Sequence, residues 1–146
     1  MVWTLGLVTL EHEYDDPPFV DEHQIQIPAS RDQVWSALRR YAESLGIGER
    51  NPLARLWGAE PRTGFEVARE VPNQQLGLAG RHRFSRYLLV FELGDLPGEE
   101  TLLTAKTYAE FPGLHGSAYR ALVIGTRFHV LAVRRMLSSI RSSSLA

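Results

Sequence analysis

The sequence of 146 residues contains no cysteine, so disulfide bonds, thiolate metal sites and cysteine nucleophiles are excluded. It has no apolar run near the ~18 residues that a membrane-spanning helix needs. Its start, MVWTLGLVTLEHEYDD, lacks the basic region of an export signal. With 44% hydrophobic residues, the chain has enough apolar material for the core of one domain. We therefore expect a single cytoplasmic domain with no stable membrane insertion.

The sequence is also poor in net charge and in lysine. Its formal net charge is -1, and Lys106 is the one lysine among 16 basic residues. Proteins that neutralise a nucleic-acid backbone usually carry a clear basic excess. We therefore expect no nucleic-acid partner.

Motifs of common catalytic and cofactor-binding sites are absent. The sequence contains no GxSxG, no GxxxxGK[ST] and no dinucleotide-binding glycine pattern. Its five histidines show neither the HxH nor the HxxxH spacing that a local zinc site would use. We therefore expect neither a metal ion nor a cofactor.

The first half of the chain shows strand and helix patterns in turn. Residues 2–12 are rich in Val, Thr and Leu and predict a strand. His23, Ile25 and Ile27 alternate with glutamines, which predicts a half-buried strand that ends at Pro28. A helix should follow directly, because Ser30 and Gln33 have the spacing of a capping box. Its buried face would hold Val34, Leu38, Tyr41 and Leu45, its end would fall at Gly46 and Gly48, and a short second helix would cover 52–57.

After Pro61 the pattern changes to short alternating runs. The turns VPN and GDLPGEE separate these runs, which predicts an antiparallel meander. From Ser117 a segment interrupted by one glycine predicts a terminal helix of about 24 residues. Its apolar stripe would consist of Leu122, Val123, Thr126, Val130, Val133, Leu137 and Ile140.

This order of elements resembles a known superfamily. VDEHQIQIPASRDQVWSAL, LGLAGRHRFSRYLLVFEL and TYAEFPGLHGSAYRALVIGTRFHVLAVRRML are similar to START-like proteins of the helix-grip fold, which include polyketide cyclases and lipid-transfer domains. The resemblance implies an α+β domain in which a curved antiparallel sheet wraps around a long C-terminal helix, with two short helices after the first strand of the family. It also implies an apolar cavity between sheet and helix. Residues 21–142 would form the core, 1–20 an extension or extra strand, and 143–146 a frayed tail.

The stretch GRHRFSRYLLVFEL, residues 80–93, combines arginines with an apolar run. If 81–93 form one strand, Arg83, Tyr87, Leu89 and Phe91 share the more apolar face, which should line the cavity. Arg83 at the cavity mouth could then hold a carboxylate or phosphate group. The alternative is a solvated strand end whose arginine stems lie on apolar surface.

The fold leaves three functions open. The leading hypothesis is a binder or carrier of a small hydrophobic or amphipathic molecule, and the expected lining is Trp35, Arg83, Tyr87, Leu89, Phe91, Tyr108, Tyr119, Val123 and Thr126. The second is a polyketide-cyclase-like enzyme with His129 or His115 as the candidate catalytic residue, although a structural role is the more common one for histidines in such positions. The third is an interaction domain or homodimer that uses Ile124, Phe128 and Leu131.

Overall fold

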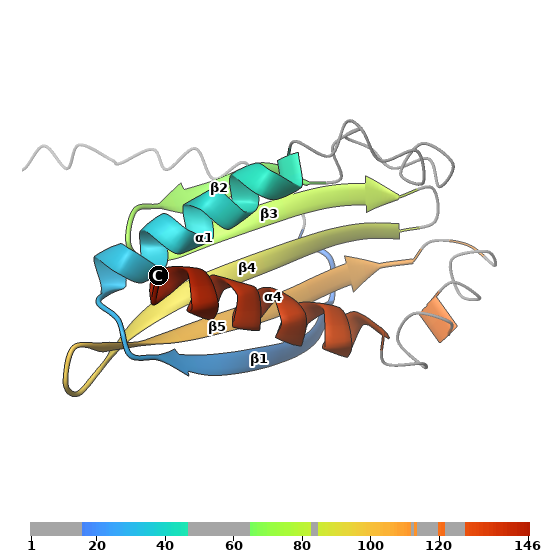
Figure 1. Ribbon diagram of the computed structural model, residues 1–146. Helices are drawn as coiled ribbons and strands as arrows, with labels where there is room; N and C mark the ends of the chain where they lie inside the picture. Colours follow the sequence, from blue (N-terminus) through green and yellow to red (C-terminus); the bar gives the residue numbers. More distant parts are fainter. Residues whose placement is uncertain (1–15, 47–64, 83–84, 112, 114–119, 122–127) are drawn as a thin grey trace, which may run out of the picture.

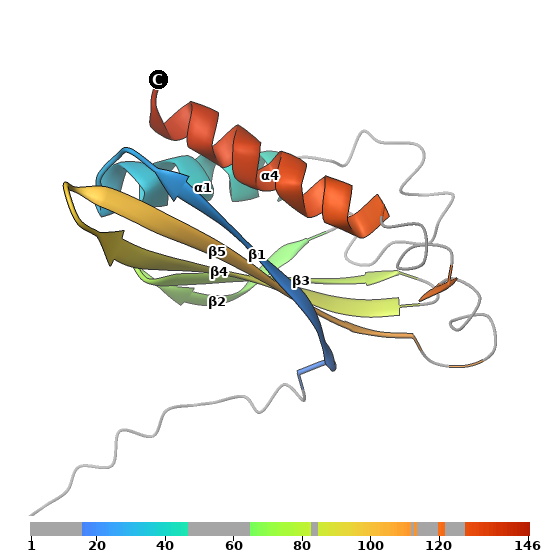
Figure 2. The same cartoon turned by 90° about the horizontal axis from the view of Figure 1, so that it is seen from below.

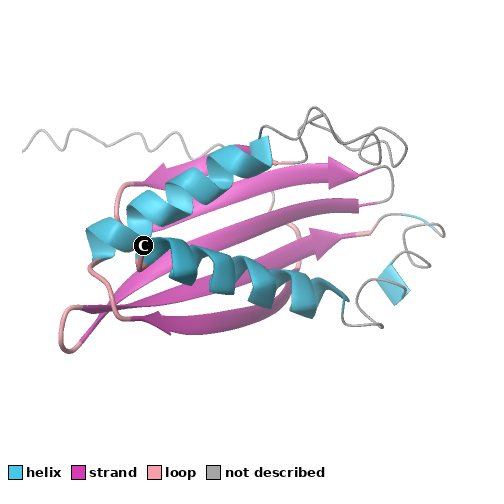
Figure 3. Cartoon of the chain, in the orientation of Figure 1, coloured by secondary structure: helices cyan, strands magenta, loops and turns pink. Residues whose placement is uncertain are grey.

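The structure is a computed structural model that describes residues 16–46, 65–82, 85–111, 113, 120–121 and 128–146. Its elements are β1 (Phe19–Ile27), α1 (Arg31–Gly46), β2 (Glu66–Val71), β3 (Gln75–His82), β4 (Ser85–Leu96), β5 (Glu100–Glu110) and α4 (Phe128–Ser144). The five strands form one antiparallel sheet in the order β1-β5-β4-β3-β2. Both helices lie on the same face of this sheet (Figures 1 and 3). We call that face the inner face and the opposite one the outer face.

This architecture confirms the α+β class and is consistent with the helix-grip fold. The terminal helix is described from Phe128 and continues to Ser144, whose hydroxyl donates to the carbonyl of Ile140 at 2.7 Å. Of the expected first part of that helix, residues 120–121 are described and are helical. The rest of that part, the strand over 2–12 and the second short helix over 52–57 lie outside the described residues. Neither described helix is long and apolar enough to cross a membrane.

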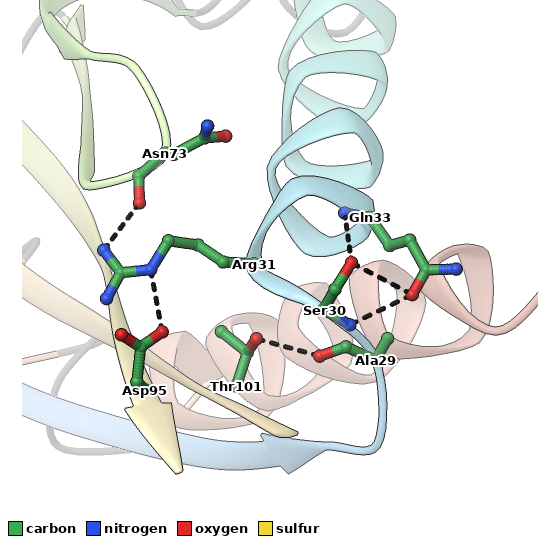
Figure 4. A network of polar contacts seen from close by, with 7 residues as sticks. All are labelled: Ala29, Ser30, Arg31, Gln33, Asn73, Asp95 and Thr101. Atoms are coloured by element: carbon green, nitrogen blue, oxygen red, sulfur yellow. Dashed lines mark hydrogen bonds and ion pairs between the residues drawn. The ribbon is translucent and has the colours of Figure 1, made fainter. Parts of the chain in front are cut away.

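The junction between β1 and α1 follows the predicted capping box. The backbone N–H of Ser30 donates to Oε1 of Gln33 at 3.0 Å, and the N–H of Gln33 donates to Oγ of Ser30 at 3.3 Å (Figure 4). These two bonds satisfy amide groups that have no partner within the first turn of a helix. The capping box is therefore confirmed, and α1 begins at Arg31.

Arg31 fixes this end of α1 to the sheet. Its Nε donates to Oδ1 of Asp95 at 2.9 Å, and its Nη1 donates to the carbonyl of Asn73 at 3.0 Å (Figure 4). The hydroxyl of Thr101 on β5 donates to the carbonyl of Ala29 at 2.9 Å. The start of the helix is thereby joined to the end of β4, the β2–β3 turn and β5.

The core lies between the inner face and the two helices. Alternate residues of the strands enter it, as their period of two requires. The helix stripes are those predicted, as far as they are described. The fully buried members include Val34 and Leu38 of α1, Leu137 and Ile140 of α4, and Ile27, Leu76, Leu78, Phe91 and Leu103 of the sheet.

The prediction that residues 81–93 form one strand was wrong. The chain reverses between β3 and β4, so that Arg81 pairs with Arg86 and His82 with Ser85. The apolar alternation starts only at Tyr87, and the polar segment before it has few side chains to bury. A hairpin end at this point therefore loses little apolar burial.

The chain enters β1 from the outer side of the sheet, away from the helices (Figure 2). The carbonyl of Pro18 accepts a hydrogen bond from the N–H of Ala109 on β5. Asp16 forms an ion pair with Arg69 on β2, at the other edge of the sheet. Residues 16–18 therefore pass over the outer face of β4, where Leu88 and Val90 are only 5% and 3% exposed.

Candidate functional site

Four of the expected lining residues lie on the inner face or pack against it. Leu89 and Phe91 are buried in the core, and Trp35 of α1 packs against the same core. Tyr87 shares their face and lies two residues before Leu89 on β4. Its ring meets that of Phe65 edge to face, with centroids 5.0 Å apart. The parity prediction for Tyr87, Leu89 and Phe91 is therefore consistent with the observed register.

Tyr108 lies on the other face of the sheet. The register pairs Tyr108 with Leu88, not with an odd-numbered residue of β4, so its side chain points outward. Its ring stacks edge to face on Phe19 at a centroid distance of 5.6 Å. The expectation that Tyr108 lines an inner cavity was therefore wrong, because it was made without the register between β4 and β5.

Five further candidates lie outside the described residues: Arg83, His115, Tyr119, Val123 and Thr126. Of the exposed patch proposed for protein contacts, only the side chain of Leu131 is described, and it is 63% exposed.

His129 has a carboxylate partner that the sequence analysis missed. Its Nε2 lies 2.6 Å from Oδ2 of Asp21 on β1, and Nε2 of His23 lies 3.2 Å from the same oxygen. The side chains of His129, His23 and Asp21 are 15%, 19% and 24% exposed. The alternation with Ile25 and Ile27 could have placed Asp21 and His23 on the buried face of β1, because residues two apart on a strand share a face, but it carried no signal for His129.

Thr107 completes this group, which we call the polar cluster: Asp21, His23, Thr107 and His129. Thr107 of β5 stands directly opposite Asp21 in the strand register and next to Leu89 of β4. The polar cluster therefore borders the apolar surface formed by Leu89 and Tyr87. Within the described part of the chain, Oδ1 of Asp21, Oγ1 of Thr107 and Nδ1 of His129 are buried and have no hydrogen-bond partner.

A carboxylate fixes the tautomer of a neutral imidazole that donates to it. With Nε2–H of His129 directed at Asp21, the other ring nitrogen, Nδ1, carries a lone pair. Nδ1 can then accept a proton or a hydrogen bond. The arrangement is thus able to bind a donor group or to remove a proton from one.

Burial decreases along the inner face toward the polar cluster. On β5, Thr101, Leu103 and Ala105 are buried, whereas Thr107 and Ala109 are partly exposed. The end of α4 approaches α1, where Nη2 of Arg40 donates to Oγ of Ser143 at 3.3 Å. Toward the start of α4 the two helices diverge (Figure 1). The inner face is therefore packed most tightly at one end, and the polar cluster lies toward the other.

In the described part of the chain, helices cover one face of the sheet, and the polar cluster lies toward its less buried end. Solved structures share this fold. They include the Mll3558 protein from Rhizobium loti (TM-score 0.53, 20% identity, 84% of this chain and 94% of that one) and TTHA0849 from Thermus thermophilus (0.52, 16%, 88% and 97%). A conserved protein from Geobacillus kaustophilus matches with a TM-score of 0.50 and 21% identity over 84% of this chain and 90% of that one. No protein-family model and no curated protein matches the sequence. At these identities the likeness concerns the fold.

Proposed function

We propose that the protein binds or carries a small hydrophobic or amphipathic molecule between the inner face of the sheet and α4. The observation that supports this most directly is the polar cluster at the border of an apolar surface. Ligand sites typically combine an apolar lining with a few polar groups that orient the ligand. Asp21, Thr107 and His129 would supply those groups, and Tyr87 and Leu89 the adjoining apolar surface.

The remaining lining residues are part of the same proposal. Trp35 would contribute from α1, and Phe91 would form the packed floor beneath the ligand. The residues outside the described part that we assign to this site are Arg83, Tyr119, Val123 and Thr126. Binding in this place would remove the partly exposed inner-face surface of Thr107 and Ala109 from water, which is favourable in proportion to its apolar area.

The test is uptake of an uncharged fluorescent polycyclic dye, Nile red, by protein from which lipids have been extracted. We expect saturable binding, because the dye is apolar and needs no charged partner. Ala109→Phe should abolish this binding, since it adds a ring to the inner face at the position opposite Tyr87. Ala79→Phe makes the same change on the outer face, opposite Leu88, and should leave dye binding intact. A failure of the wild-type protein to take up dye would contradict the proposal, as would equal effects of the two substitutions.

The pairing of His129 with Asp21 favours a second candidate, an enzyme that moves a proton on its ligand. Nδ1 of His129 would act as a general base, and Asp21 would stabilise the imidazolium that forms. We expect His129→Gln to lower turnover of an enolisable polyketide-like substrate by roughly 10²–10⁴-fold, the usual contribution of a general base. Dye binding by the same variant is the control. Nile red is apolar and needs no charged partner, so a folded His129→Gln variant should still bind it. Unchanged turnover in both His129→Gln and Arg83→Gln would exclude the proposed catalytic site.

A further inference from the structure

Three polar atoms of the polar cluster are buried without a partner in the described part of the chain. They are Oδ1 of Asp21, Oγ1 of Thr107 and Nδ1 of His129, and they come from three different elements, β1, β5 and α4. Buried polar atoms in folded proteins almost always have a hydrogen-bond partner, supplied by protein, water or ligand. Three such atoms in neighbouring side chains indicate that a further polar group belongs at this point.

The chemical nature of these atoms restricts what that group can be. A carboxylate oxygen only accepts hydrogen bonds. In the neutral ring, Nδ1 of His129 also accepts, because Nε2, which lies 2.6 Å from Oδ2 of Asp21, then carries the proton and donates it to that oxygen. The hydroxyl of Thr107 can donate or accept. Two of the three atoms therefore require a hydrogen-bond donor, and none of them requires an acceptor.

The charge of the site also argues against a negatively charged group at this point. Asp21 is acidic, and the two groups that face its Oδ2 are imidazoles. The described arginines that reach inner-face positions of the sheet are already paired, Arg39 with Glu70 at 3.1 Å and Arg31 with Asp95 at 2.9 Å. A negatively charged head group beside Asp21 would be repelled, and burial strengthens that repulsion.

Resting on the proposed function, we propose that the polar end of the ligand is a hydrogen-bond donor without negative charge, namely an alcohol or an amine. This group donates to Oδ1 of Asp21 and to Nδ1 of His129, and an alcohol oxygen accepts from the hydroxyl of Thr107. The apolar part of the ligand lies along Leu89 and Tyr87. This assignment differs from that of an anion held by Arg83, which the sequence pattern suggested.

The test compares three straight-chain competitors of equal length for their ability to displace Nile red at neutral pH: decanol, decylamine and decanoate. The three differ only in the head group. We expect decanol or decylamine to displace the dye at a concentration about tenfold lower than decanoate. Displacement by decanol identifies a neutral donor, and stronger displacement by decylamine identifies a cationic one.

Two variants connect this preference to the polar cluster. Asp21→Asn keeps the shape of the side chain but removes its charge, so it should reduce the preference for the amine or alcohol over decanoate to less than about threefold. Thr107→Val removes a hydroxyl at nearly constant volume and should weaken decanol while leaving decylamine unchanged. Thermal melting identifies any variant that fails to fold, and the wild-type ranking of the three competitors tests the inference even then.

The outcomes separate this inference from the proposed function. If decanoate displaces the dye as well as or better than decanol and decylamine, the inference is wrong and the binding function stands. If Asp21→Asn and Thr107→Val both keep the wild-type ranking, the head group lies elsewhere and the inference is also wrong. If wild-type protein takes up no Nile red at all, the proposed function itself fails.

Discussion

Gly77 of β3 lies beneath the side chain of Arg69 of β2: a Cβ atom at Gly77 would stand 3.2 Å from Cβ and 3.5 Å from Cγ of Arg69. The two residues are direct partners in the strand register and point to the outer face. The absence of a side chain at Gly77 lets Arg69 extend across β3 and pair with Asp16. Asp16, which lies just before β1, is thus held from the opposite edge of the sheet.

This arrangement predicts that Gly77→Ala destabilises the protein. The contact would be tighter than about nine in ten real Cβ contacts, and the nearest atom is Cβ of Arg69, whose position is fixed by the backbone of β2. We expect a loss of about 1–3 kcal/mol, the usual range for overpacking. Gly94→Ala is the matched control, because Gly94 also lies in a strand and its nearest contact, Leu102, is at 3.9 Å. Urea unfolding of both variants measures the difference, and equal midpoints would show that Gly77 has no special role.

Local patterns predicted the parts of this fold that depend on neighbouring residues. The capping box of Ser30 and Gln33 marked the start of α1, and alternation marked the inner face of β4 from Tyr87 to Phe91. The face of Tyr108 could not be read in this way. It depends on how β4 and β5 align, and that register is set by the whole sheet.

The candidate site was harder to predict for the same reason. His129 and Asp21 are 108 residues apart in the sequence, and no spacing rule joins a strand at one end of a domain to a helix at the other. A single histidine or aspartate also matches no sequence motif that would mark it as part of a site. The passage of residues 16–18 over the outer face depends likewise on a pairing with Arg69 that only the folded sheet creates.

A fully buried hydroxyl joins β5 to the start of α1. Thr101 is 0% exposed and donates to the carbonyl of Ala29. Thr101→Val keeps the volume but leaves that carbonyl without its donor, so we expect a loss of about 1–3 kcal/mol in the free energy of unfolding. Thr101→Ser keeps the hydroxyl and loses only a methyl group, for which about 1 kcal/mol is expected. Calorimetry of the pair tests the claim, which would be refuted if the serine variant were the less stable one.

Tyr41 makes the stability of the fold sensitive to alkaline pH. Burial against the core raises the pKa of Tyr41 above its ordinary value of about 10. As the pH rises, the Tyr41 hydroxyl therefore loses its proton at a lower pH in the unfolded chain than in the folded protein. The contribution of Tyr41 to stability is constant below pH ~10 and decreases as the pH rises toward the pKa of the folded state. Lys106 acts in the same sense, because its hydrogen bond with Glu92 raises the pKa of the ammonium group. We expect Tyr41→Phe to reduce, but not abolish, the decrease in urea midpoint between pH ~8 and pH ~11. An identical decrease in the variant and the wild type would contradict this role for Tyr41.

Two leucines of α4 offer a comparison of its two faces. Leu137 is 2% exposed in the core, whereas Leu131 is 63% exposed. Leu137→Ala should lower the free energy of unfolding by about 2–5 kcal/mol because it opens a cavity. Leu131→Ala should change it by less than about 0.5 kcal/mol in a monomer, because the side chain is already in water. If this side of the helix forms the predicted homodimer contact, Leu131→Ala should instead weaken self-association and lower stability in a way that depends on protein concentration. Sedimentation and thermal melting of both variants over a range of concentrations distinguish the two cases, and no concentration dependence in the wild-type protein would rule out the dimer.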